Sequence, residues 1–133
     1  CPFDSLKIKN VNKILAIDYG NAERVTGWVK ELQAKYPNLY IVKSTPFFCE
    51  IGSSMAKKSL GVEFLAKYWG LSKDEILTIG DQNNDIELLK AGGVKVAMGN
   101  ATQELKECAT YITDTVENDG FVKAIEKFCT LPV

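Results

Sequence analysis

The chain has 133 residues, 46% hydrophobic and 25% charged, which suits one globular domain or part of a larger one. Its formal net charge is −1, it has no basic stripe and no long apolar run, and its first residues do not read as a signal peptide, so we expect neither nucleic-acid binding nor membrane insertion. It has no histidine and no closely spaced pair among Cys1, Cys49, Cys108 and Cys129, which argues against zinc and imidazole chemistry and favours reduced thiols in a cytoplasmic protein.

The first block of the chain combines short apolar runs with one amphipathic segment. Residues 13–17 are predicted as a strand and residues 21–34 as a helix, because apolar side chains recur there at helical spacing. Residues 39–42 and 47–51 follow as two strands, and Ser44-Thr45-Pro46 between them fits a hairpin-like connection. The last two strands are therefore expected to pair in antiparallel fashion.

The second block alternates helices and strands, which predicts an α/β fold with helices covering a parallel sheet. We place the boundary at Gly52-Ser53-Ser54 and expect domains 1–53 and 54–133. Gly70 is a predicted helix stop, and Ser72 to Glu75 has the spacing of a capping box. The predicted elements are helix 55–69, strand 76–79, helix 84–91, strand 94–97, helix 102–108, strand 111–113 and helix 116–128.

This second block has only about three strands, whereas a doubly wound sheet usually has about five or more. We infer that strands are missing from it. The first residue, Cys1, is not methionine, which also favours a processed chain or a fragment. An incomplete sheet exposes an unpaired strand edge, so we expect a second copy or the missing half of the protein to pair with this chain.

The segment Gly80-Asp81-Gln82-Asn83-Asn84-Asp85 is the most informative motif, because it joins the end of a predicted strand to the start of a helix. In an open parallel sheet, ligands bind beyond the carboxyl ends of the strands. Asp81 and Asp85 are separated by about one helical turn, and paired carboxylates suit Mg²⁺, while Asn84 lies where a helix start favours an anion. The alternative is that Asp81, Asn83 and Asn84 only cap and turn the chain.

Two lysines, Lys57 and Lys58, open the long predicted helix before this strand. A lysine at a helix N-terminus opposes the helix dipole, which is explained either by an anionic ligand or by simple exposure to solvent. Further on, Met98-Gly99-Asn100-Ala101 ends a strand, and we expect Asn100 to cap the following helix. The segment Asn118-Asp119-Gly120 is most simply a turn.

Taken together, Lys58, Gly70-Leu71, Gly80 to Asp85, Met98 to Ala101 and Asn118 to Gly120 resemble the C-terminal part of Cof-type phosphatases of the haloacid dehalogenase-like hydrolase superfamily. The resemblance implies the C-terminal half of a Rossmann-like core in residues 54–133. Residues 1–53 are then the second half of an α/β cap.

The resemblance also implies roles for individual residues. Asp81 is similar to the family's magnesium ligand, and Asp85 to its partner acid, which either binds the metal through water or orients other groups. Asn84 matches a residue that contacts phosphate or holds the metal loop. Lys58, at the family's usual distance before Leu71, matches the active-site lysine and so also the phosphate site. The next residue is Ser59 where the family usually has glycine, which leaves Lys57 as a weaker candidate.

The family's DxDGT nucleophile motif and its phosphate-binding Ser/Thr are absent from this sequence. Ile17-Asp18-Tyr19-Gly20 imitates the motif but lacks its second acid, so Asp18 is not expected to be the nucleophile. The resemblance implies a Mg²⁺-dependent phosphatase that acts on small phosphorylated metabolites, such as sugar phosphates, through an aspartyl-phosphate, with this chain inactive alone. The alternatives are a non-catalytic module that binds a partner and, less favoured, a receiver-like domain.

Overall fold

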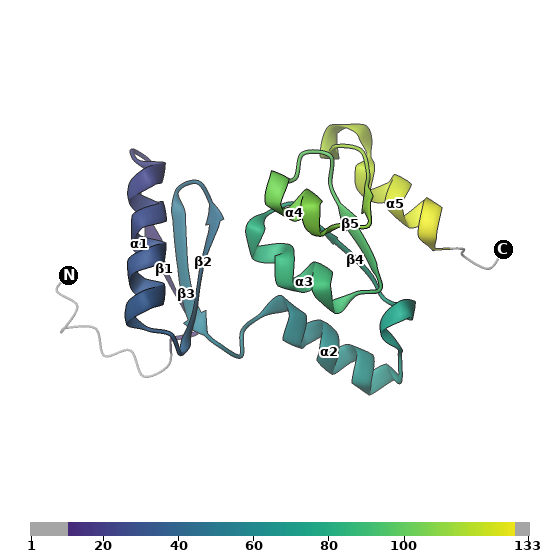
Figure 1. The fold of residues 1–133 in the computed structure, drawn as a ribbon, viewed down its shortest axis with the longest axis horizontal. Helices are drawn as coiled ribbons and strands as arrows, with labels where there is room; N and C mark the ends of the chain where they lie inside the picture. Colours follow the sequence, from purple (N-terminus) through teal and green to yellow (C-terminus); the bar gives the residue numbers. More distant parts are fainter. Residues whose placement is uncertain (1–10, 130–133) are drawn as a thin grey trace. The chain divides into compact units, whose positions relative to one another are not determined.

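The computed structural model describes residues 11–129, and these residues belong to two compact units that divide after Met55 (Figure 1). The first unit contains β1 (Lys13–Ile17), α1 (Ala22–Lys35), β2 (Leu39–Thr45) and β3 (Phe48–Ser53). Its sheet has the order β1-β3-β2, and both strand pairs are antiparallel. The predicted antiparallel pairing of the last two strands is therefore confirmed.

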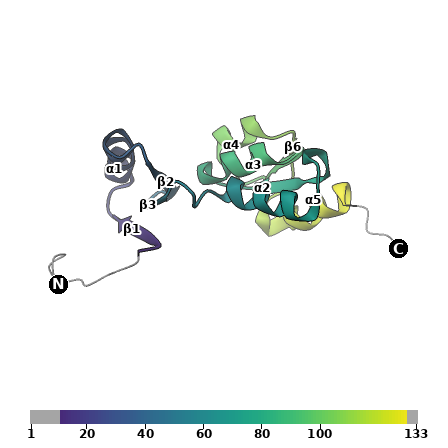
Figure 2. The same cartoon turned by 90° about the horizontal axis from the view of Figure 1, so that it is seen from below.

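The helix α1 packs on one face of this sheet, as the spacing of its apolar residues predicts (Figure 2). Val25 of α1 is buried with Ile41 of β2 and Cys49 of the central strand β3. Burial raises the pKa of the Cys49 thiol, with a smaller contribution from the neighbouring Glu50 charge, so the thiol stays protonated and behaves as a small apolar side chain. The helix begins where the Asn21 side chain accepts a hydrogen bond from the Arg24 backbone N–H (2.9 Å).

One boundary in this unit differs from the prediction. Ser44-Thr45-Pro46 was expected to connect the strands, but β2 continues to Thr45, which pairs with Phe48. The turn is shorter because the Thr45 hydroxyl accepts a hydrogen bond from the Phe47 backbone N–H (3.3 Å), which reverses the chain immediately after Pro46.

The second unit contains a parallel sheet of the order β4-β5-β6, which confirms the predicted α/β class. Figure 1 shows β4 and β5 between α3 and α4 on one side and α5 on the other. The buried core lies between the sheet and the helices α3 and α4, and contains Leu89, Ala97, Met98, Ala101 and Leu105. The elements are α2 (Lys58–Trp69), η2 (Lys73–Glu75), β4 (Leu77–Gly80), η3 (Asn83–Asp85), α3 (Ile86–Ala91), β5 (Val94–Ala97), α4 (Gln103–Cys108), β6 (Tyr111–Ile112), η4 (Val116–Asn118) and α5 (Gly120–Phe128).

Local sequence signals fix both ends of the connection between α2 and β4. Gly70 adopts the left-handed conformation at φ 69°, which ends α2 where the sequence predicts a stop. Ser72 and Glu75 form the predicted capping box, in which the Glu75 carboxylate accepts a hydrogen bond from the Ser72 backbone N–H (2.8 Å). That hydrogen bond holds the pKa of Glu75 below its usual range.

Three predicted helices begin or run differently in the structure. The helix α2 starts at Lys58 and not at Met55, because the Ser53 hydroxyl accepts the Met55 backbone N–H (3.2 Å) and holds a turn there. A 3₁₀ turn, η3, replaces the first turn of the helix expected from residue 84. The helix expected over residues 116–128 is divided into η4 and α5 by Asp119, whose φ of 54° is incompatible with a continuing α-helix.

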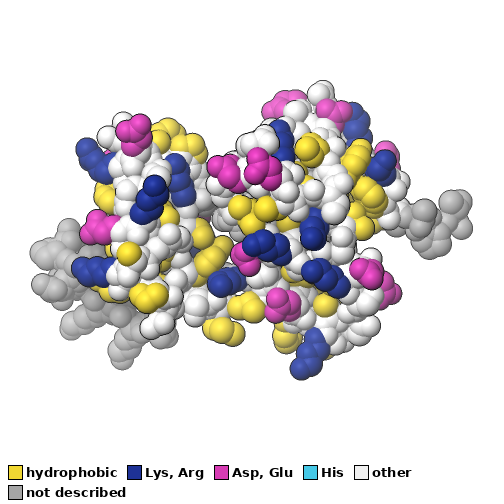
Figure 3. All heavy atoms as spheres, in the orientation of Figure 1, with side chains coloured by type: hydrophobic (Ala, Val, Ile, Leu, Met, Phe, Trp, Pro, Cys, Tyr) yellow, Lys and Arg dark blue, Asp and Glu magenta, His cyan; other side chains and the backbone are white. Residues whose placement is uncertain are grey.

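The surface of the second unit carries an apolar patch on α2. Phe64, Tyr68 and Trp69 are 69%, 75% and 61% exposed. Charged side chains of both signs are interspersed over the face of each unit seen in Figure 3. Within residues 11–129, no helix is both long and apolar enough to cross a membrane.

Candidate functional site

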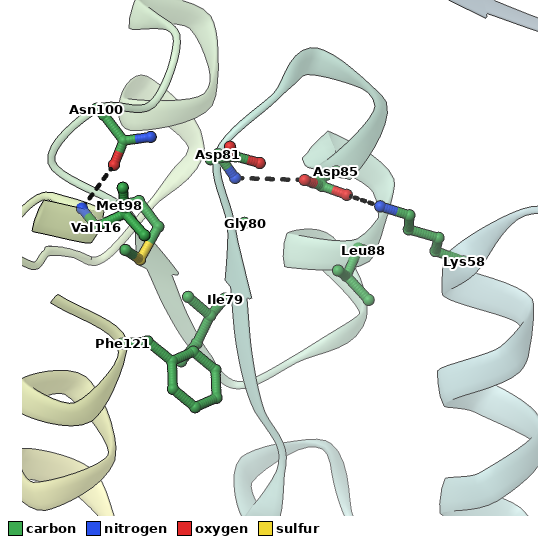
Figure 4. A pocket seen from close by; sticks show the side chains of 10 residues that line it. All are labelled: Lys58, Ile79, Gly80, Asp81, Asp85, Leu88, Met98, Asn100, Val116 and Phe121. Carbon is green, nitrogen blue, oxygen red and sulfur yellow. Dashed lines mark hydrogen bonds and ion pairs between the residues drawn. The ribbon is translucent and has the colours of Figure 1, made fainter. Parts of the chain in front are cut away.

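A pocket of about 330 Å³ lies at the carboxyl ends of β4 and β5 in the second unit (Figure 4). This is the edge of a parallel sheet at which ligands are expected. Side chains from α2, α3, α5 and the loops after the strands surround it. They are Lys58, Ile79, Gly80, Asp81, Asp85, Leu88, Met98, Asn100, Val116 and Phe121.

The turn after β4 is compact because Gly80 has no side chain. A Cβ at this position would lie 2.6 Å from the Asp85 Cβ and 3.1 Å from Leu89 Cδ1. The glycine therefore lets the chain fold back so that Asp85, only 5% exposed, sits beside the end of the strand. Asp85 is also held through its backbone N–H, which donates to the Gln82 carbonyl (2.8 Å).

Both oxygens of the Asp85 carboxylate have partners. Oδ1 forms an ion pair with the Lys58 ammonium, and Oδ2 accepts hydrogen bonds from the backbone N–H groups of Asp81 (3.3 Å) and Gln82 (3.4 Å). The Lys58 side chain is 53% exposed and lines the pocket, so it remains accessible to a ligand there. Asp85 thus links the α2 lysine to the backbone of the β4 turn, and its charge is balanced in place.

Asp81 differs from Asp85 because its carboxylate makes no hydrogen bond or ion pair with any residue that the structure describes. Its backbone carbonyl accepts the Thr102 N–H (3.0 Å), which anchors the residue without using the side chain. The carboxylate is therefore available to a cation or a substrate in the pocket. Residues 11–129 contain no group of three or more His, Cys, Asp or Glu side chains that could hold a metal ion.

The structure brings three of the four predicted site residues into this pocket, namely Lys58, Asp81 and Asp85. Asn84 lies in η3 beside Asp85 but is not one of the lining residues. The neighbouring Lys57 is the N-cap of α2, does not line the pocket and makes no side-chain cap hydrogen bond. Of the two lysines, Lys58 is the one that faces the carboxylates.

The opposite wall of the pocket was not predicted from the sequence. Asn100 was expected to cap α4, but Thr102 takes that role by accepting the Leu105 backbone N–H (3.4 Å). Asn100 instead accepts a hydrogen bond from the Val116 backbone N–H (3.2 Å), because the loops after β5 and β6 lie together. Phe121 of α5 completes this wall. One feature of the sequence could have predicted this wall: these segments follow neighbouring parallel strands, whose carboxyl ends lie at the same edge of the sheet.

The sequence is similar to known proteins along most of its length. The family model described as haloacid dehalogenase-like hydrolase matches residues 1–125. Phosphoglycolate phosphatase 1 of Saccharolobus solfataricus is 40% identical over 105 residues, which cover 79% of this chain and 43% of that protein. The Bacillus subtilis 5-amino-6-(5-phospho-D-ribitylamino)uracil phosphatase YcsE is 37% identical over 97 residues, or 73% of this chain and 39% of that protein.

Solved structures share the fold. A haloacid dehalogenase-like hydrolase from Bacteroides thetaiotaomicron is 33% identical with a TM-score of 0.70, over 90% of this chain and 45% of that chain. The HAD subclass IIB sugar phosphatase BT4131 is 27% identical with a TM-score of 0.77, over 90% of this chain and 44% of that chain. The 133 residues therefore span less than half the length of each of these relatives.

Proposed function

Because the chain belongs to the haloacid dehalogenase-like hydrolases, we propose that it supplies one side of a magnesium-dependent phosphatase site. The observation that carries the proposal is the convergence of Lys58, Asp81 and Asp85 in one pocket at the carboxyl ends of parallel strands. The phosphatases among the relatives support phosphoryl-ester hydrolysis as the reaction class.

Asp81 is the proposed direct ligand of Mg²⁺. Its carboxylate has no partner among the described residues, and hard oxygen ligands suit this ion, which keeps several of its waters. When bound, Mg²⁺ supplies positive charge that stabilises the phosphoryl oxygens during transfer. A single available carboxylate fits the ion chemically but holds it weakly, so further ligands are expected from outside these 133 residues.

Asp85 and Lys58 have a different proposed role. Since both oxygens of Asp85 are already used, we assign it to orientation: it holds the Lys58 ammonium in the pocket and braces the backbone N–H groups of Asp81 and Gln82. Lys58 then presents positive charge to the phosphoryl group. Asn84 lies in η3, next to Asp85, and is proposed either to hold this turn or to contact phosphate from the rim of the pocket.

The nucleophile is proposed to come from chain outside these residues, and hydrolysis to proceed through an aspartyl-phosphate. Asp18 is a poor candidate, because its carboxylate accepts the Gly20 backbone N–H (2.9 Å) and pairs with Arg24 (3.1 Å) inside the first unit. We assign residues 1–53 to the second half of a cap and residues 54–133 to the C-terminal half of the core.

The proposed substrates are small phosphorylated metabolites. Sugar phosphates are the first candidates, since BT4131, described as a sugar phosphatase, shares the fold over 90% of the chain. The proposed partner is the missing half of the protein or a second copy. Two features support it: among the residues that the structure describes, β4 pairs with β5 alone, and the aromatic side chains of α2 are exposed.

The test compares the 133-residue chain with the complete protein that contains it. The chain alone is expected to release no phosphate from p-nitrophenyl phosphate with Mg²⁺, whereas the complete protein hydrolyses it and loses activity in the Asp81→Asn variant. Magnesium-dependent hydrolysis by the chain alone, abolished by Asp81→Ala, would contradict the division of the site. A complete protein whose activity is indifferent to Asp81 would contradict the proposed site itself.

A further inference from the structure

Asn100 lies on the wall of the pocket across from the lysine. Figure 4 shows Asn100 and Lys58 on opposite sides of Asp81. The two residues come from segments far apart in the sequence, the loop after β5 and the start of α2. A ligand bound at Asp81 therefore has a cation on one side and a neutral carboxamide on the other.

The hydrogen bond from Val116 fixes which end of the carboxamide faces the pocket. A backbone N–H can only donate, so it requires the oxygen of Asn100 (3.2 Å) and excludes the flipped amide. The Asn100 nitrogen, with its two N–H donors, must then point the other way. Figure 4 shows this nitrogen directed toward the side on which Asp81 lies.

Backbone contacts hold the loop that carries Asn100. The Gly99 N–H donates to the Asp114 carbonyl (2.9 Å), and the Ala101 N–H donates to the Met98 carbonyl (2.9 Å). Gly99 approaches the neighbouring segment so closely that a Cβ would lie 2.8 Å from the Asp114 carbonyl carbon. The position of Asn100 is therefore set by two backbone bonds, a close packing contact and its own bond to Val116.

We propose that Asn100 is a phosphate-binding residue, whose carboxamide N–H groups donate to a phosphoryl oxygen of the substrate. A phosphoryl group offers only acceptors at neutral pH, so it matches two oriented donors as well as the Lys58 ammonium. A carboxamide adds donors without a further charge close to Asp81. This inference rests on the proposed function and adds a contact on the second wall of the same pocket.

The test uses the ¹⁵N-labelled chain with Mg²⁺, titrated with inorganic phosphate and followed by NMR. The side-chain N–H signals of Asn100 are expected to shift along the same binding curve as the backbone signals of Asp81. Asn100→Asp keeps an oxygen for the Val116 N–H but replaces the donors with negative charge, so it should raise the dissociation constant for phosphate at least tenfold.

Asn118→Asp is the matched control, because it adds the same charge nearby at a residue that does not line the pocket. Its phosphate affinity is expected to stay within about twofold of the parent chain. If Asp81 responds to phosphate while Asn100 does not and Asn100→Asp binds normally, this inference is wrong and the proposed function stands. If neither Asp81 nor Asn100 responds, either in the chain or in the complete protein that contains it, both are contradicted.

Discussion

Lys58 and Asp85 form an ion pair in which the lysine is half exposed and the carboxylate is almost fully buried. The pair joins the first residue of α2 to the turn after β4, 27 positions apart in the sequence. Because it sits at the rim of the pocket, it fixes the lysine toward a ligand and also holds two elements of the fold together.

Replacing Lys58 by methionine is expected to destabilise the second unit. The change leaves a buried carboxylate with only two long backbone hydrogen bonds, so a loss of about 1–3 kcal/mol in the free energy of unfolding is expected. Denaturant unfolding measures it. Lys57→Met, at the adjacent residue outside the pocket, should change stability by less than about 0.5 kcal/mol. Equal effects of the two substitutions would show that the ion pair adds no stability.

Gly80→Ala should destabilise the turn because its new Cβ meets the Asp85 and Leu89 side chains. Overpacking at a rigid position costs about 1–3 kcal/mol. Gly61→Ala is the contrasting change: it lies inside α2 with nothing within 4 Å of its Cβ, so it should stabilise by about 0.5–1 kcal/mol. Thermal unfolding of both variants checks these opposite signs, and a stabilising Gly80→Ala would refute the close approach.

Asp81→Asn is expected to separate function from stability. Because the carboxylate has no partner among residues 11–129, the variant should unfold within about 0.5 kcal/mol of the parent chain. Magnesium binding, followed by NMR shifts of the turn after β4, should be lost. Asp85→Asn should instead lower stability, since it removes the charge paired with Lys58. Retained magnesium binding in Asp81→Asn would argue against the assigned ligand.

The ion pair between Asp114 and Lys123 (2.6 Å) predicts a dependence of stability on pH. The hydrogen bond from Lys123, helped by the Thr115 backbone N–H, lowers the pKa of Asp114 below its value in the unfolded chain. This contribution to stability is present above the unfolded pKa, near 4, and is lost as the pH falls through the folded pKa. When the free energy of unfolding is measured as a function of pH, Asp114→Asn should reduce the loss of stability on the acid side.

Lys123→Met removes the hydrogen bond that contributes most to the lowered pKa of Asp114, so it should also weaken the loss of stability at acid pH. The pKa of Lys123 is raised by the same hydrogen bond, so its contribution is present below the unfolded pKa and is lost only as the pH rises through the folded value, in the alkaline range. The parent chain should therefore lose stability both at acid pH, where Asp114 becomes protonated, and at alkaline pH, where Lys123 loses its proton. If both variants lose stability at acid pH as steeply as the parent chain, the role of this pair is contradicted.

The exposed aromatic face of α2 predicts self-association of the isolated chain. Light scattering is expected to detect a species heavier than one chain, and the double substitution Phe64→Ser with Tyr68→Ser should weaken association by about tenfold or more. Tyr19→Ser, at a residue 70% exposed in the first unit, is the control and should leave association unchanged. A clean monomer for the parent chain would rule out this expectation.

The elements around the site were predictable where the signal is local. Gly70 and the Ser72–Glu75 capping box act within a few residues, so the sequence predicted both. The division of the last helix was not predicted, because periodicity does not show how closely the backbone of residues 114–115 approaches Gly120, just after Asp119. A Cβ at the next residue, Gly120, would lie 1.9 Å from the Asp114 carbonyl oxygen, so the chain must turn sharply there.

By itself, the sequence determined the α/β class, the family resemblance and the position of Asp81 and Asp85 beyond the end of a strand. It did so because a motif after a strand inherits its position from the parallel sheet. Only the tertiary structure decided that Lys58 pairs with Asp85, that Asp85 is engaged while the Asp81 carboxylate is open, and that Asn100 lines the same pocket. Those outcomes depend on contacts between residues far apart in the chain, which local periodicity and spacing do not encode.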